Sequence, residues 1–115
     1  MSKFGFQKHR EEIKRSLSEI LQFDTSDPRL EFVTVMDVRL SKDVRYATVY
    51  VSVAGSSHPQ DEILEVLKDH KGFFRTELAH RLQIRHTPEL RFEIDDLADR
   101  AQRIENILRE DSQKT

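Results

Sequence analysis

The first part of the chain carries hydrophobic residues at the spacing of a helix. They fall on one side of a 3.6-residue period, at Phe6, Ile13, Leu17, Ile20 and Leu21. This pattern predicts a helix that ends near Phe23. The Asp27-Pro28 step then breaks the chain, because proline lacks a backbone N–H and disfavours helical geometry in the residue before it.

From Leu30 the hydrophobic period changes to two, which is typical of a strand. One side of this strand would carry Phe32, Thr34, Met36, Val38 and Leu40, and the other Val33, Val35, Asp37 and Arg39. A second strand is predicted from Tyr46 to Val53, with an apolar side formed by Ala47, Val49, Val51 and Val53. Because the short polar connection Ser41-Lys42-Asp43 lies between them, we expect the two strands to form a β-hairpin.

Helical spacing returns after the loop at residues 55–59, where Pro59 suits the first turn of a helix. The buried stripe is predicted at Ile63, Leu64, Val66 and Leu67 and, beyond Gly72, at Phe74, Leu78 and Leu82. We predict two helices that meet in a tight bend at Gly72, because glycine lowers helix propensity and readily adopts left-handed turn geometry.

A third strand is predicted after Pro88, where Leu90, Phe92 and Ile94 alternate with polar residues. Helical spacing then recurs at Leu97, Ala101, Ile104 and Leu108. The expected order is therefore α-β-β-α-α-β-α. A length of 115 residues allows one compact domain, which we place at residues 1–94, followed by a C-terminal helix and frayed tail at 95–115.

Composition narrows the class of protein. The chain has no cysteine, which excludes disulfides, thiolate zinc sites and cysteine nucleophiles. No apolar run approaches the roughly 20 residues that cross a bilayer. We therefore expect a soluble cytoplasmic protein without a membrane partner.

The formal net charge of −2 is unevenly distributed along the chain. Residues 1–15 and residues 70–92 each carry five Lys or Arg against two acidic residues, a balance of +3. The segments 16–69 and 93–115 are acidic, with balances of −5 and −3. Two basic segments in an acidic protein could focus a polyanion onto one face, although ordinary solvated surfaces would give the same counts.

The sequence offers little for catalysis. Asp95 and Asp96 would point apart in a strand, and at a helix start they would serve as caps. The five histidines, at positions 9, 58, 70, 80 and 86, lack metal-binding spacing, and the chain has no glycine-rich phosphate loop. We therefore expect no enzyme activity, metal, cofactor or small-molecule substrate.

Nucleic-acid binding has better support. Arg75 and Arg81 flank opposite edges of the apolar stripe, so they do not form a patch by themselves. Phosphate contacts are expected at the bend, from Lys71, and at the far helix end, from Arg85. Lys8 shares its face with acidic residues and would equally suit a salt-paired surface. For Phe73 we favour core packing over an exposed base-stacking role.

Two blocks of sequence resemble the bacterial ribosome-binding factor A family of small-subunit maturation factors. The first block is Asp27-Pro28-Arg29-Leu30, Val33-Thr34-Val35, Val38, Leu40-Ser41, Asp43, Tyr46-Ala47 and Val49-Tyr50-Val51. The second is Gly72-Phe73-Phe74-Arg75, Leu78, Arg81-Leu82, Arg85 and Pro88-Glu89-Leu90. Asp95-Asp96 with Arg103-Ile104 is similar to the family's tail. The motifs follow one another at matching spacing over most of the chain.

This resemblance implies an α+β fold of the type II KH-like kind, in which a three-stranded sheet in αββααβ order packs on helices and a C-terminal helical tail follows. It also implies an assembly factor that binds the free small (30S) ribosomal subunit or its precursor. Such a factor supports late maturation and processing of 16S rRNA, near its 5′ region and above all in the cold. We expect a monomer. The RNA-binding candidates are Lys71, Gly72, Arg75, Arg81, Arg85, Lys3, Lys8, Arg10, Lys42 and Arg45.

Two departures affect how RNA would be held. KH domains commonly grip the backbone with a Gly-x-x-Gly loop, whereas Arg75 stands here at the second glycine. The family has an Ala-x-Gly bend instead, and His70 occupies its alanine position. Two alternatives stay open: a protein-interaction module of the same fold without direct RNA contact, and a small hydrolase built on Asp95-Asp96.

Overall fold

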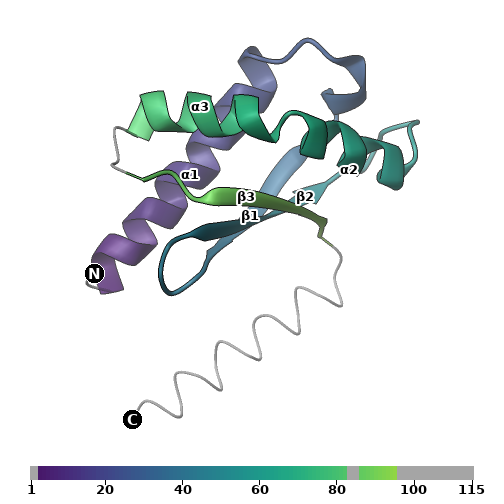
Figure 1. Cartoon of the computed structure of the whole chain (residues 1–115). Helices are drawn as coiled ribbons and strands as arrows, with labels where there is room; N and C mark the ends of the chain where they lie inside the picture. The colour runs from purple at the N-terminus through teal and green to yellow at the C-terminus, as the bar shows by residue number, and fades with distance from the viewer. Residues whose placement is uncertain (1–2, 83–85, 96–115) are drawn as a thin grey trace.

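The computed structural model describes residues 3–82 and 86–95. In chain order the elements are α1 (Lys3–Phe23), the 3₁₀ helix η1 (Pro28–Leu30), β1 (Thr34–Leu40), β2 (Tyr46–Ser52), α2 (Gln60–Asp69), α3 (Lys71–Leu82) and β3 (Glu89–Ile94). Strand β2 is central, antiparallel to β1 and parallel to β3. The three helices lie together on one face of the sheet (Figure 1). The predicted α+β class and the αββααβ order are confirmed.

Helix α1 forms where the 3.6-residue spacing predicted it. Ile13, Leu17 and Ile20 are at most 1% exposed and pack in the core. The helix ends at Phe23, and Asp27 then caps η1 by accepting a 2.9 Å hydrogen bond from the backbone N–H of Arg29. The predicted break at proline is therefore a short 3₁₀ turn, in which Pro28 needs no N–H.

Strand β1 differs from its prediction in both start and phase. It begins at Thr34, because Pro28–Leu30 forms η1. A β-bulge between Val35 and Asp37 leaves Met36 without a partner on β2. The extra residue shifts the alternation, so Val35 is buried on the same side as Val38 and Leu40. The predicted division of β1 into two sides was therefore wrong before the bulge and right after it.

Strands β2 and β3 follow their predictions. Ala47, Val49 and Val51 are fully buried, and Leu90 and Phe92 of β3 point into the same core. Because β2 and β3 are parallel, the chain must cross over between them, and α2 with α3 forms this crossover. Phe74 and Leu78 of α3 are also completely buried. The Phe74 and Phe92 rings meet edge to face, with centroids 5.7 Å apart.

The bend between α2 and α3 lies at His70, two residues before its predicted position. His70 leaves helical geometry (φ −98°, ψ 9°), and its ring Nδ1–H donates to the Val66 carbonyl oxygen at 2.8 Å, at the end of α2. Gly72 lies inside the first turn of α3. The expected left-handed turn at Gly72 was wrong, since the left-handed glycine of the described residues is Gly55, with φ 90°. Pro59, which was expected in the first turn of this helix, instead precedes α2 as its N-cap residue.

The predicted C-terminal helix at Leu97 to Leu108 lies outside the described residues. The division of the chain at residue 94 therefore stays a prediction. Within the described part the core is continuous: side chains from α1, η1, α2, α3 and all three strands belong to one buried cluster.

Candidate nucleic-acid interface

A hollow of about 790 Å³ lies where α1, the β1–β2 connection and the segment before β3 come together. In Figure 1 the start of α1, this connection and the start of β3 lie at the same end of the molecule. The residues lining the hollow that can carry positive charge come from four separate segments: His9, Arg45, Arg75 and His86. Two carboxylates, Asp43 and Glu89, also line it. We call this feature the cationic hollow, after its two arginines and two histidines. The fold thus brings together residues from both basic segments of the sequence and from the hairpin.

The β1–β2 connection is a tightly bonded turn that projects Arg45 outward. The Ser41 hydroxyl donates to the Asp43 carboxylate at 2.7 Å, and the backbone N–H of Arg45 donates to the same oxygen at 3.1 Å. These bonds, the one from Ser41 first, hold the pKa of Asp43 below its ordinary value. Val44 has φ 59°, a left-handed geometry that is costly for a β-branched residue. The Arg45 side chain is 80% exposed, with its Nε 3.6 Å from Asp43.

Arg75 connects α3 to the opposite wall of the cationic hollow. Its Nε and Nη2 donate to the carbonyl oxygen of Thr87 at 3.3 and 3.0 Å. Beside it, Lys71 Nζ lies 3.7 Å from the Glu89 carboxylate. Arg75 is exposed, and a guanidinium carries five N–H donors, so donors are left for an anion. The side chain both orders the segment before β3 and offers charge to the hollow.

Arg81 lies elsewhere and is engaged by two carboxylates of the protein. Its Nη1 donates to Glu19 at 2.9 Å and its Nη2 to Asp24 at 2.6 Å. Both acids come from α1 or the residue that follows it. The structure therefore does not bring Arg81 to the cationic hollow but places it in a link between α3 and α1.

The remaining predicted RNA contacts are dispersed. Lys8 and Lys42 are exposed. Arg10 is half-buried, lies 3.6 Å from Glu11, and has a buried Nε without a hydrogen-bond partner among the described residues. Gly72 is exposed in α3. The Lys3 side chain and all of Arg85 lie outside the described part of the chain.

Sequence reasoning missed His9 and His86 as members of the site. Both were considered only as metal ligands, yet each is adjacent to a basic candidate, His9 to Lys8 and Arg10 and His86 to Arg85. It also missed Tyr46, which lines the cationic hollow. The Arg91 guanidinium lies over the Tyr46 ring, 4.0 Å from the ring centroid. This cation–π contact joins neighbouring strands and had no signal in the sequence, because the two residues are far apart along the chain.

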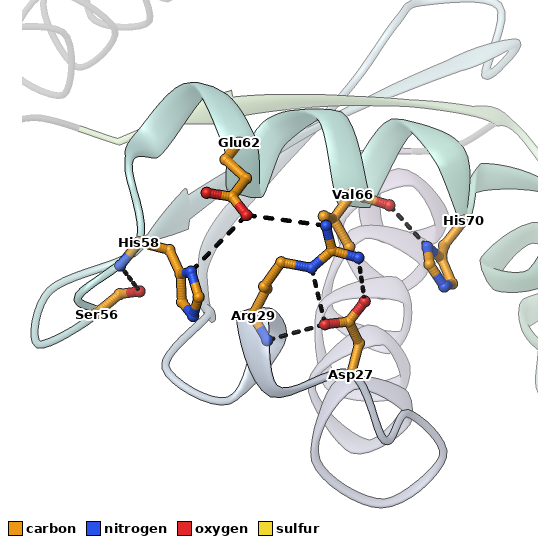
Figure 2. Close-up of polar contacts among 7 residues, drawn as sticks. All are labelled: Asp27, Arg29, Ser56, His58, Glu62, Val66 and His70. Atoms are coloured by element: carbon orange, nitrogen blue, oxygen red, sulfur yellow. Dashed lines mark hydrogen bonds and ion pairs between the residues drawn. The ribbon is translucent and has the colours of Figure 1, made fainter.

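A second polar cluster joins η1 to α2. The Arg29 guanidinium donates to both oxygens of Asp27, from Nε at 3.1 Å and from Nη2 at 2.7 Å, and its Nη1 lies 3.9 Å from Glu62 (Figure 2). The side-chain bonds from Arg29 are the main cause that lowers the pKa of Asp27 to about 2. His58 Nδ1 lies 3.8 Å from the same Glu62 carboxylate. Phe73, near this cluster, is 38% exposed, so its predicted core packing is met only in part.

Residues 3–82 and 86–95 contain no group of three or more His, Cys, Asp or Glu side chains placed to hold a metal ion. Within these same ranges, no helix has the length and apolar character needed to span a membrane.

Comparison with known proteins identifies the family. A family model described as ribosome-binding factor A matches residues 6–108. A relative of that name from Acetivibrio thermocellus is 45% identical over 103 residues, which is 89% of this chain and 84% of the relative. The crystal structure of ribosome-binding factor A from Thermus thermophilus superposes with a TM-score of 0.71 at 33% identity, covering 78% of this chain and 94% of that one.

A further match is a homology model of the Thermus thermophilus ribosome-binding factor A, fitted into the cryo-EM map of a 30S–RbfA complex. It has a TM-score of 0.61 at 34% identity and covers 73% of this chain and 88% of that one. These similarities agree with the KH-like order of the elements seen here. On the evidence of the family model, its relatives and the shared fold, the chain belongs to the ribosome-binding factor A family.

Proposed function

We propose that this chain binds the free small (30S) ribosomal subunit or its precursor by laying rRNA backbone on the cationic hollow. The observation that carries the proposal is the convergence of Arg45 and Arg75, from distant parts of the sequence, on one hollow with two histidines. Arginine presents planar N–H donors that suit phosphate oxygens, and phosphate contacts provide most of the affinity in nucleic-acid binding. The fitted 30S complex of the Thermus relative supports the choice of partner.

Contacts of this kind favour shape and backbone over base identity. The Arg45 side chain is 80% exposed on a hydrogen-bonded turn, and Arg75 is oriented by the Thr87 carbonyl oxygen. Both are therefore accessible to phosphates of a folded rRNA segment. We infer a role in late maturation and processing of 16S rRNA, near its 5′ region and above all in the cold, played by a monomeric, non-catalytic factor in the cytoplasm.

A sedimentation profile of the tagged protein across ribosomal fractions tests the proposal. We expect the protein to be enriched with free small subunits, absent from full ribosomes and released as salt rises, because each phosphate contact displaces a counterion. Equal distribution over all fractions would contradict it. Ribonuclease treatment of a pull-down separates the alternative, since association that survives complete RNA removal would indicate a protein-interaction module.

A further inference from the structure

A second hollow, of about 730 Å³, lies between the residues that follow α1 and the junction of α2 with α3. Its walls include Pro28 and Arg29 from η1, His58 from the loop before α2, and His70 and Phe73 from the junction. Figure 2 shows Arg29, Asp27 and His70 turned toward the same space between η1 and α2. The RNA contacts proposed above do not use this hollow, which we call the junction hollow.

Phe73 provides the junction hollow with a supported aromatic ring. The ring is 38% exposed. Its centroid lies 5.7 Å from that of Phe74, which is completely buried, with an angle of 57° between the rings. The buried neighbour contacts Phe73, and more than a third of Phe73 stays exposed. A rigid ring with an accessible surface is the feature on which single-stranded nucleic acids stack their bases.

The carboxylates that line the junction hollow are already paired, so they do not exclude RNA by unbalanced charge. Asp27 is held by the Arg29 guanidinium, and Asp24 by Arg81 at 2.6 Å. His70 is partly committed as well, because its Nδ1–H donates to the Val66 carbonyl oxygen. Its Nε2 is then the ring nitrogen left to form a hydrogen bond with the edge of a base.

The junction hollow and the cationic hollow lie on different sides of the start of α3. Phe73 lines the first and Arg75 the second, and a separation of two residues places them about 200° apart around a helix. Gly72 is exposed next to Phe73, and a Cβ added there would have no heavy atom within 4 Å. A strand of RNA could therefore cross the helix at Gly72 without meeting a side chain at that residue.

We propose that the junction hollow receives one unpaired nucleobase of the RNA strand whose phosphates lie on the cationic hollow. Phe73 stacks on the base, and His70 Nε2 contacts its edge. This inference rests on the proposed function and adds a base-dependent contact to a surface otherwise governed by phosphate. The ligand class is thus a single-stranded or bulged RNA segment with an extruded base.

The chain contains no tryptophan, so the Phe73→Trp variant carries a single fluorescent reporter in the junction hollow. It is titrated with a short single-stranded RNA and with a matched abasic strand that has the same number of phosphates. We expect saturable quenching of the tryptophan emission by the intact strand and none by the abasic strand. The matched control is Phe32→Trp, since Phe32 is 49% exposed but lines neither hollow.

Affinity measurements with a labelled strand complete the test. Phe73→Ala should weaken binding of the intact strand about 5- to 150-fold and leave binding of the abasic strand unchanged. Phe73→Leu, which keeps the apolar bulk without the ring, should lose as much. An equal loss for both strands would overturn the inference, as would normal binding without quenching of the Phe73→Trp variant.

The two proposals fail in different ways. Binding that Arg45→Glu abolishes but that never quenches the Phe73→Trp reporter would overturn the nucleobase site alone. Quenching by small-subunit proteins and not by RNA would assign the junction hollow to a protein ligand and overturn the inference too. The absence of salt-sensitive binding to RNA or to small subunits would overturn both proposals.

Discussion

Arg81 should stabilise the fold and contribute no charge to the cationic hollow. It links the C-terminal part of α3 to α1 through Glu19 at 2.9 Å and Asp24 at 2.6 Å. The exposed fractions of the three side chains are 31%, 46% and 35%, so solvent screens both pairs. A pair of this kind contributes about 0.2–1 kcal/mol. We therefore expect Arg81→Ala, which removes both, to lower the free energy of unfolding by about 1 kcal/mol.

Urea unfolding followed by circular dichroism measures this loss. For a domain of this size, a change of about 1 kcal/mol moves the melting temperature by roughly 4–8 °C. A double-mutant cycle with Asp24→Asn should give a coupling energy of about 0.5 kcal/mol, and a cycle with Glu19→Gln somewhat less, because Glu19 is the more exposed partner.

The same variant distinguishes structure from function. Below its melting transition, Arg81→Ala should lose less co-sedimentation with small subunits than Arg75→Ala does, because it leaves the cationic hollow intact and removes only the partner of Asp24 beside the junction hollow. A coupling energy of zero in both cycles would refute the structural link. A loss of co-sedimentation equal to that of Arg75→Ala would return Arg81 to the RNA-binding surface.

Four further substitutions test the fold. Phe74→Ala should lower the free energy of unfolding by about 3–5 kcal/mol, since Phe74 is completely buried between the helices and β3; a urea titration that shows under 1 kcal/mol would contradict this packing. Gly72→Ala should raise the melting temperature and the free energy of unfolding, the latter by up to about 1 kcal/mol, because the residue is helical and no heavy atom lies near the added Cβ. Gly55→Ala should lower the free energy of unfolding by about 1–2 kcal/mol, because Gly55 has φ 90°. The opposite order of stabilities would indicate that the left-handed bend lies at Gly72. Asp27→Asn should remove a part of the stability that depends on pH. Because folding lowers the pKa of Asp27 from 3.8 to about 2, the ionised carboxylate contributes fully above pH 3.8, and this contribution is lost as pH falls through about 2. Over that pH range the urea midpoint of the variant should therefore vary less than that of the parent protein.

Local patterns predicted most of the elements. The 3.6-residue spacing of α1 and the alternation of β2 arise from which side chains must face the core, and both patterns hold over the whole element. The break before β1 was predicted from Pro28 alone, since proline restricts its own backbone and that of the preceding residue.

Other features depend on contacts that the sequence does not display. Alternation alone cannot reveal the bulge at Met36, because an extra residue looks like part of the same strand until its partner strand is known. The bend lies at His70, whose side chain bonds to the Val66 carbonyl oxygen, whereas the low helix propensity of glycine had pointed to Gly72. The functions of the arginines depend on tertiary partners, Glu19 and Asp24 for Arg81 and Thr87 for Arg75.

The candidate site shows the same division. Charge counts indicated two basic segments, and residues of both line the cationic hollow. The hollow also includes Arg45 from the hairpin, a position that lies in an acidic stretch of the sequence. The parallel pairing of β2 with β3, in which Tyr46 lies opposite Glu89, brings the turn beside the start of β3, and Figure 1 shows the start of α1 at the same end of the molecule.

The most direct test of the central claim is the affinity for isolated small subunits of two charge-reversal variants, measured over a range of salt concentrations. Arg45→Glu changes an 80% exposed side chain in the cationic hollow, and Lys68→Glu makes the same charge change on the exposed surface of α2, outside that hollow. We predict that Arg45→Glu weakens binding at least about tenfold and reduces the salt dependence by roughly one phosphate contact, while Lys68→Glu binds like the parent. Equal affinities for the two variants, with both still folded, would contradict the account.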